Sequence, residues 1–293
     1  MRRFLAKLAF NKKTLFMGVF FVSALVSFFY PVTTTAAGCS ADNNPSQLES
    51  VTVKWVYDGD TLLLTDKRKI RLIVDTPEVK HHKQKRQAYA AKAREALRVL
   101  LKKSHYRVNL RYGAERKDRY SRTLAHVYTP SGINIANWLL EKGLASTMIF
   151  PPNIKLAHCY KQAEGQAQQH VLGIWRLKRN KIKAAANLSG RAKGHIRLKG
   201  RIKKVIHHKK SIIMELDSHS KRPIQIKIKK KHFRYFKHFD TDKLWDKTII
   251  ISGYLKNKRY KRTISLKHPF QIRVLSHKKI EKPTIIWSSH NAD

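Results

Sequence analysis

The sequence predicts a protein of two folded parts, the first a mixed α+β domain and the second built only of β-strands. Two observations support this: strand-like and helix-like segments alternate as far as Trp175, and from His195 onward only short β-branched runs occur. The 293 residues are enough for two domains with separate cores. The hydrophobic content of 42% is typical of globular proteins.

The first part, residues 48–178, has the order of three strands, a helix, two strands and two helices. Alternating apolar and polar residues predict the strands, and an apolar stripe at helical spacing predicts the long helix. Asp58-Gly59 follows the first strand and is a strong tight-turn pair. The expected strands are 51–57, 61–65, 68–74, 106–112 and 122–128, and the expected helices are 84–103, 134–142 and 156–170.

The second part, residues 194–277, consists of short β-branched runs separated by polar turns. Five strands within about eighty residues favour a small barrel of oligonucleotide-binding shape. The expected strands are 196–206, 211–216, 223–228, 248–254 and 263–266. Residues 179–193 are basic, rich in alanine and without strand pattern, so they are expected to form a linker, and residues 278–293 form a C-terminal tail.

The N-terminal segment, residues 1–38, has the pattern of a signal peptide and leader. A basic start is followed by an apolar run over residues 15–30, shorter than a full bilayer span, and then by small residues. The pattern predicts an exported protein, periplasmic or secreted, with cleavage near Ala37. Two alternatives remain open, an uncleaved membrane anchor and lipid attachment at Cys39, and both also place the folded part outside the cytoplasm.

Cys39 and Cys159 are the only cysteines, which excludes a thiolate zinc site and a CxxC redox pair. The two could pair in an oxidising compartment. Because Cys39 lies in the leader, we expect instead a free or lipidated Cys39 and a buried Cys159.

The charge of the chain indicates a polyanionic partner. Lys and Arg total 62 against 19 Asp and Glu, a formal net charge of +43, and the second part is the more basic per residue. Phosphate backbones and anionic lipid surfaces both satisfy this charge. Several aromatic residues of the second part lie among lysines, as in nucleic-acid platforms, although core packing would explain them equally well: Tyr235, Phe236, Phe239, Trp245 and Tyr260.

Carboxylates and arginines of the first part suit phosphodiester chemistry. Asp60 follows the Asp58-Gly59 turn and Asp75 closes the third strand, so two neighbouring strands bring carboxylates to one rim as hard-oxygen ligands for Ca²⁺ or Mg²⁺. Arg71 and Arg122 offer guanidinium groups, which bind phosphate bidentately and stay charged. The alternative is that the carboxylates only cap turns and the arginines coat the surface.

Five motifs stand in an order that resembles the staphylococcal nuclease (thermonuclease) family. They are YDGDT at 57–61, VDTPE at 74–78, DRYSR at 118–122, GLA at 143–145 and GIW at 173–175. The resemblance covers roughly residues 51–175. It implies a five-stranded barrel of oligonucleotide-binding type with three helices, and Ca²⁺-dependent hydrolysis of DNA and RNA without sequence preference. The second part has a weaker similarity to the barrel appended to some bacterial thermonuclease-like proteins.

The resemblance also implies a role for each residue of the site. Asp60 and Asp75 are expected to bind Ca²⁺ together with the backbone carbonyl of Thr76. Glu78 is expected to activate water, and Arg71 and Arg122 to bind the phosphate. Further contacts to nucleic acid are expected from Lys80, Lys83 and Phe150.

Arg71 departs from the family pattern, because it precedes Asp75 by four residues where the family has five. A one-residue change turns a strand side chain to the opposite face, and a bulge at the barrel rim can reverse that effect. We expect such an adjustment here.

Two other functions remain as alternatives: a non-catalytic nucleic-acid-binding protein on the same scaffold, and a basic envelope protein that coats anionic lipid or polysaccharide.

Overall fold

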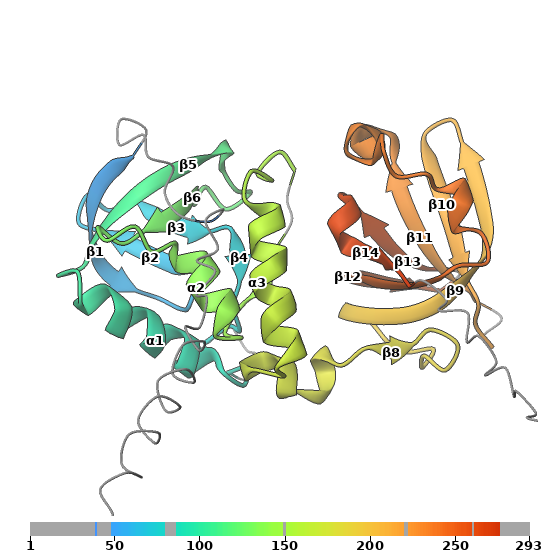
Figure 1. Ribbon diagram of the computed structural model, residues 1–293, viewed down its shortest axis with the longest axis horizontal. Coiled ribbons are helices and arrows are strands. Elements are labelled where there is room, and N and C mark those ends of the chain that lie inside the picture. The colour runs from blue at the N-terminus through green and yellow to red at the C-terminus, as the bar shows by residue number, and fades with distance from the viewer. Residues whose placement is uncertain are drawn as a thin grey trace, which may run out of the picture. The chain divides into compact units, whose positions relative to one another are not determined.

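The computed structural model describes residue 39 and residues 48–79, 86–148, 151–219, 222–259 and 261–275. Figure 1 shows two groups of strands, one coloured blue to green and one yellow to red. Each group closes into a five-stranded barrel, and the α-helices belong to the first part. The predicted fold class, an α+β barrel domain followed by a second all-β barrel, is confirmed.

The first barrel closes in the order β1-β2-β3-β6-β5. Its strands are β1 (Glu49–Val56), β2 (Thr61–Leu64), β3 (Lys69–Leu72), β5 (Arg107–Lys117) and β6 (Thr123–Tyr128). Only β3 and β6 are parallel neighbours, and the short strands β4 (Val74–Asp75) and β7 (Ser146–Thr147) form a separate antiparallel pair. Leu62, Leu64, Ile70 and Leu72 are fully buried in the core, so the alternate side chains of β2 and β3 face outward.

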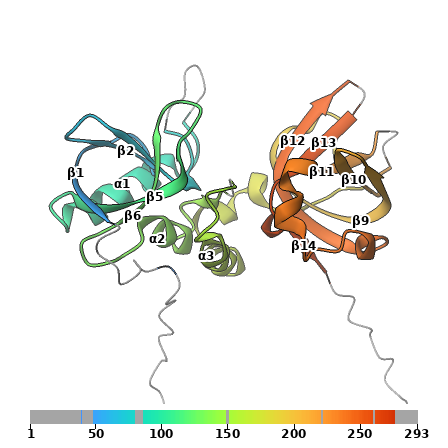
Figure 2. The ribbon, with the colours of Figure 1, turned by 90° about the horizontal axis from the view of Figure 1, so that it is seen from above.

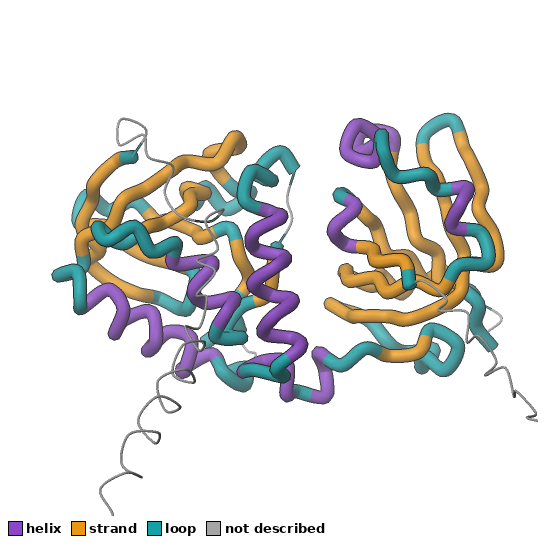
Figure 3. Tube along the Cα trace, viewed as in Figure 1, coloured by secondary structure: helices purple, strands orange, loops and turns teal. Residues whose placement is uncertain are grey.

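Within the described residues three α-helices accompany the first barrel and are drawn in purple in Figure 3: α1 (Ala90–Lys102), α2 (Ile135–Glu141) and α3 (Ala157–Gln169). The expected start of α1 was wrong, because residues 86–89 are not helical. Tyr89 has a φ of 69°, in the left-handed region, and a right-handed helix cannot continue through that conformation. Leu97 and Leu101 then fix α1 to the core.

The GLA and GIW motifs serve packing. Gly143 and Gly173 both have positive φ, and the amide of Ile174 donates to the carbonyl of Gly143 at 2.8 Å. A Cβ atom at Gly173 would lie 2.1 Å from that same carbonyl oxygen. Only glycine allows this approach, which joins the end of α2 to the turn after α3.

The second barrel repeats the strand order of the first. Its strands are β9 (Gly194–His208), β10 (Ser211–Leu216), β11 (Ile224–Lys229), β12 (Thr248–Lys258) and β13 (Lys261–Leu266). They close in the order β9-β10-β11-β13-β12, with β11 and β13 as the parallel pair, and Figure 2 shows them around a common interior. All five runs expected from the sequence are strands, and β14 (Ile272–Val274) adds to β12.

The segment expected to be a linker packs on the second barrel. The 3₁₀ helices η2 (Gly173–Arg176) and η3 (Lys178–Asn180) lead into β8 (Lys183–Ala184), which pairs with β9, and Ala185 and Leu188 enter the second core. The fully buried Arg262 donates to the carbonyls of Leu188 and Ser189. Residues 183–189 are therefore part of the packing of this barrel.

Aromatic residues of the second part divide between core and surface. Phe236 is buried within η4 (Lys230–Phe236), and Tyr235 and Phe239 pack against the same core. Trp245, after η5 (Asp242–Leu244), is 65% exposed. Tyr260 lies outside the described residues. A surface role therefore stays open for Trp245.

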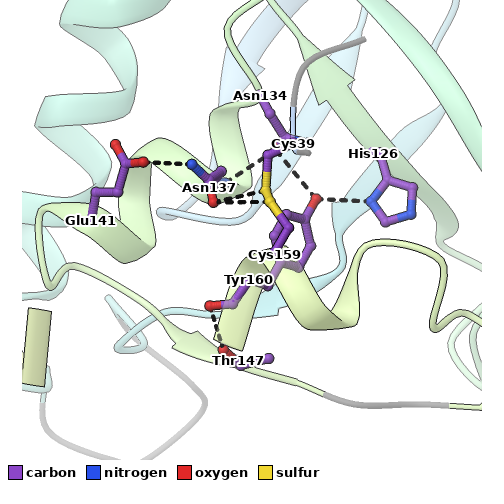
Figure 4. The surroundings of a disulfide bond; sticks show 8 residues. All are labelled: Cys39, His126, Asn134, Asn137, Glu141, Thr147, Cys159 and Tyr160. Atoms are coloured by element: carbon purple, nitrogen blue, oxygen red, sulfur yellow. Dashed lines mark hydrogen bonds between the residues drawn. A yellow bond between two sulfur atoms is a disulfide. The ribbon is translucent and has the colours of Figure 1, made fainter. Parts of the chain in front are cut away.

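The expectation for the cysteines was wrong, because Cys39 and Cys159 form a disulfide. Figure 4 shows the bond beside Asn137 of α2, whose side-chain oxygen lies 3.0 Å from the sulfur of Cys39. Cys39 is buried, so the chain close to the leader is fixed to α3. A sulfur atom in this bond cannot carry a lipid.

In the part of the chain that the structure describes, no helix is long and apolar enough to cross a membrane. The apolar run over residues 15–30, on which the export prediction depends, lies outside the described residues.

Candidate active site

The turn between β1 and β2 places Asp60 at the centre of the site. Gly59 packs so closely on Thr76 and Ala93 that a Cβ atom there would lie 2.9 Å from both side chains. Asp60 is completely buried and accepts from the amide and the hydroxyl of Thr76 at 2.8 and 2.9 Å. The hydroxyl of Thr61 donates to its other oxygen at 3.1 Å. These bonds fix the carboxylate against the chain that follows β3.

Arg71 reaches the same carboxylate from β3. Its guanidinium forms an ion pair with Asp60 and a second with Asp75, at 3.1 Å. Ile73 belongs to neither strand and separates β3 from β4, so the strand is interrupted between Arg71 and Asp75. This interruption places Arg71 beside both carboxylates, despite the one-residue shortening.

Arg122 is held by the loop between β5 and β6. Asp118 accepts from its Nε at 2.8 Å and lies 2.7 Å from its Nη2, and Asp118 also accepts from the amides of Tyr120 and Arg122. Burial raises the pKa of Asp118, but the hydrogen bonds from Arg122 and Tyr120 outweigh it, so the pKa lies below its ordinary value. The guanidinium also lies 5.4 Å from the centre of the Tyr120 ring. Arg122 is therefore oriented before any substrate binds.

The charges of neighbouring groups act on Arg71 and Asp58. Burial lowers the pKa of Arg71, Asp75 opposes this, and Arg122, Asp58 and Glu78 also act on it. Burial likewise raises the pKa of Asp58, while the charges of Arg71 and Arg122 lower it. Glu78, after Pro77, accepts at its backbone oxygen from the amide of Gln87 at 3.0 Å. Arg71 thus contacts two carboxylates directly and is acted on by the charges of Arg122, Asp58 and Glu78.

Three predicted contacts to nucleic acid, Lys80, Lys83 and Phe150, lie outside the described residues. Sequence reasoning missed two supporting residues, Thr61 and Asp118. Both stand inside quoted motifs, and Asp118 had a usable signal, because an acidic residue four positions before an arginine across a tight turn is well placed to orient it.

The donor set fits a hard divalent cation. Asp60 and Asp75 contact the two terminal nitrogens of one guanidinium, so the two carboxylates lie close together. Carboxylate and backbone carbonyl oxygens are the ligands that Ca²⁺ prefers, and the carbonyl of Thr76 would be the third. Within the described residues no group of three or more His, Cys, Asp or Glu side chains converges. A cation here would therefore depend on two side chains and on backbone or water oxygens.

Comparisons with known proteins agree with this geometry. The family model described as staphylococcal nuclease homologue matches residues 69–177. The chain is 41% identical to a thermonuclease of Staphylococcus intermedius over 133 residues, 43% of this chain and 76% of that protein. It is 32% identical to endonuclease YncB of Bacillus subtilis over 151 residues, 50% of this chain and 71% of that protein. A thermonuclease of Staphylococcus hyicus is 37% identical over 125 residues, 41% of this chain and 72% of that protein.

The fold, the clustered carboxylates and arginines and these relatives together define an enzyme of the phosphodiester hydrolase class. The chain belongs to the staphylococcal nuclease family.

Proposed function

We propose that this protein is an exported, Ca²⁺-dependent nuclease that hydrolyses phosphodiester bonds of DNA and RNA without sequence preference. The observation that carries the proposal is the ion-paired cluster of Asp60, Arg71 and Asp75, with Glu78 and Arg122 acting on it. A protein that only binds nucleic acid has no need of two carboxylates at the phosphate site, because they repel the substrate.

Each side chain has one step in the proposed reaction. A bound Ca²⁺ would neutralise charge on the phosphate and help to position it. Arg122, held by Asp118, donates to the phosphate oxygens, and Arg71 does the same once it exchanges a carboxylate partner for the substrate. Glu78 removes a proton from the attacking water. The water oxygen forms a bond to phosphorus while the bond from phosphorus to the 5′-oxygen breaks. The 5′-oxygen leaves as a hydroxyl with a proton from solvent, and a 3′-phosphate remains on the other product, as the family resemblance implies.

The chemistry of the cluster supports cleavage without sequence preference. The groups of the cluster are cations and carboxylates, which suit phosphate oxygens and a metal rather than the edges of particular bases. Relatives named thermonuclease and endonuclease support the same chemistry.

Digestion of plasmid and single-stranded DNA by the chain from Gly38 onward tests the proposal. We expect cleavage with Ca²⁺, none in excess chelator, and recovery when Ca²⁺ is restored, because two carboxylates bind Ca²⁺ only modestly. The matched control is Glu78→Gln, which keeps the shape of the side chain and should stay inactive with Ca²⁺. Full activity in excess chelator would contradict the assignment.

Export is supported by the signal-like pattern of residues 1–38 and by the disulfide, which is typical of oxidising compartments. Fractionation of cells that produce the full chain should place the protein outside the cytoplasm with its N-terminus near residue 38.

We also propose that the second barrel holds nucleic acid without cleaving it. Where the first barrel has Asp58 and Asp60 between its first two strands, the second has Lys209 and Lys210 between β9 and β10. Lys230 follows β11 and its amide donates to the carbonyl of Lys210 at 2.9 Å, so these lysines lie side by side. The strands and loops at this side are those that bind oligonucleotides in barrels of this type.

A further inference from the structure

Two large aromatic side chains project from the outer surface of β1. Trp55 is 55% exposed and Tyr57, the first residue after the strand, is 41% exposed. Val56 between them is buried in the core, so both rings lie on the opposite side of the backbone from the barrel interior. Neither ring is needed to fill the core.

A β-bulge causes this exposure. Val53 is buried and pairs with Leu64, and regular alternation would turn Trp55 inward as well. The register shifts between Val53 and Trp55, so Trp55 stands opposite Leu63 and Val56 takes the next inward place. Bulges often redirect a side chain next to an active site. Here the bulge exposes an indole that would otherwise be core.

Residues paired across neighbouring strands connect both rings to β3, the strand that carries Arg71. In one row Trp55 stands opposite Leu63 and Leu63 opposite Lys69. In the next row the amide of Tyr57 donates to the carbonyl of Thr61 at 3.0 Å, and Thr61 stands opposite Arg71. Neighbouring strands are about 4.8 Å apart, so the backbone that carries both rings lies about 10 Å from the strand that carries Arg71.

Lys69 connects the aromatic rings to the catalytic cluster. It precedes Arg71 by two residues and so faces the same side of β3. Its Nζ lies 5.6 Å from the centre of the Tyr57 ring. This surface, which we name the β1 platform, therefore consists of Trp55, Tyr57 and Lys69 and offers two flat rings with a cation between them and the cluster.

We propose that the β1 platform binds unpaired bases next to the phosphate that is cleaved, so that Trp55 and Tyr57 supply stacking energy to the bound strand in this protein. Bases of a single strand stack on aromatic rings without sequence preference, and a lysine neutralises the phosphate between them. Bases inside a duplex already stack on each other and present no free face. The inference rests on the proposed nuclease function, because it assigns the platform to the strand that occupies that site.

Binding of oligothymidylate of about ten nucleotides, a length that covers one such barrel, measures the effect without catalysis. The chain from Gly38 onward carries Glu78→Gln in every sample, together with Lys209→Ser, Lys210→Ser and Lys230→Ser to weaken binding by the second barrel, and fluorescence anisotropy reports binding. We expect Trp55→Ala/Tyr57→Ala to lose at least tenfold in affinity for the single strand, about 1.4 kcal/mol. Affinity for a blunt duplex of equal length should change less than threefold.

Two further variants separate stacking from damage to the fold. Trp55→Phe/Tyr57→Phe keeps both rings and should restore most of the affinity for the single strand. Val99→Ala removes an apolar side chain of α1 that is 51% exposed, and should leave that affinity unchanged. With Glu78 restored, the double alanine variant should raise KM on single-stranded DNA at least tenfold and leave kcat within about twofold, since the platform lies outside the reacting atoms.

Wild-type affinity of the double alanine variant for the single strand would overturn the inference, and so would an equal loss on single strand and duplex. The proposed function fails by a different result: no metal-dependent cleavage by the chain with Glu78. The binding measurement does not depend on cleavage, so the two failures are distinguishable.

Discussion

Arg71 shows at the scale of the residue how packing and chemistry are combined in this site. Its guanidinium is almost fully buried and is balanced by the carboxylates of Asp60 and Asp75. Burial of a charge is costly unless it is paired, so this arginine stabilises the site as well as preparing it for phosphate. Arg122, only partly buried, has its partner in Asp118 on the surface loop.

Replacement of the two arginines should therefore have different effects on stability. Arg122→Ala should lower kcat by a factor of about 10²–10³, which is the usual loss when one group that stabilises developing charge is removed. It should leave the melting temperature nearly unchanged. Arg71→Ala should lower kcat to a similar extent and also cost about 3–5 kcal/mol of stability, because the fully buried carboxylate of Asp60 loses its cation. Kinetics and urea unfolding of both variants check this.

Arg98→Ala is the matched control, because its ion pair with Glu95 lies on the exposed side of α1. It should change neither kcat nor the free energy of unfolding. An Arg71→Ala enzyme with normal turnover would show that this arginine only serves packing.

His126 gives a prediction for pH. It is buried with its Nδ1 2.8 Å from the hydroxyl of Tyr160, and burial lowers its pKa to about 4. In the unfolded chain it binds a proton near pH 6.5, so between pH 6.5 and 4 the unfolded state holds more protons and stability falls as pH falls. The loss is on the order of 3 kcal/mol. Urea unfolding at pH 7 and 4.5 should show it.

His126→Gln should reduce that dependence on pH, although its stability at pH 7 is lower because the hydrogen bond is altered. His105→Gln, at an exposed position, should retain the full dependence. If the stability of His126→Gln falls with pH as steeply as that of the wild type, other groups cause the loss of stability at low pH.

At the scale of the element, the disulfide is what fixes the N-terminal end of the folded chain to α3. It closes a loop with a sequence separation of 120. A cross-link over such a distance restricts the unfolded chain, and its removal from a folded domain commonly costs about 2–4 kcal/mol. Asn137 beside the sulfur atoms also donates to Glu141, so α2 takes part in the same contact.

A reductant should therefore lower the melting temperature of the oxidised protein by several degrees, as calorimetry or circular dichroism would measure. The variant Cys39→Ser/Cys159→Ser should melt at the lower temperature with and without reductant. If the oxidised wild type and the variant melt together, the bond does not contribute to stability.

At the scale of the whole molecule, the chain contains one barrel topology twice with opposite charge at corresponding positions. The first barrel has carboxylates in the turn after its first strand, and the second has Lys209 and Lys210 there. The segment with β8, Ala185 and Leu188 belongs to the second barrel. A fragment of that barrel should for this reason begin before β8.

Residues 38–178 alone should cleave DNA in Ca²⁺, and residues 181–293 alone should bind DNA without cleaving it. Binding by the second fragment should weaken steeply with salt, since contacts of lysine to phosphate release counterions. Electrophoretic shift at several salt concentrations measures this.

Salt dependence is measured as the slope of the logarithm of affinity against the logarithm of salt concentration. Replacement of Lys209, Lys210, Lys230 and Lys231 by serine should reduce the magnitude of this slope by several units, because each lost phosphate contact lowers it by about 0.9. Lys243→Ser/Lys247→Ser, at exposed positions that follow Thr241, should have a smaller effect. If the fragment shows no salt-sensitive binding, the second barrel serves another partner.

The sequence by itself determined the two-part fold and the family. Alternation in the strands, the Asp58-Gly59 turn and the five ordered motifs are local properties, and local patterns determine which segments become strands. They also pointed to Asp60, Asp75 and Arg71 as one group, which the structure brings together.

Tertiary structure decided what depends on distant segments. The pairing of Cys39 with Cys159 requires that Cys39 lie against α3, and no local pattern specifies this. The approach of Gly173 to Gly143 and the packing of residues 183–189 on β9 are likewise long-range. Trp55 faces solvent only because a bulge shifts the register of β1 against β2, and a bulge is a property of two paired strands rather than of one.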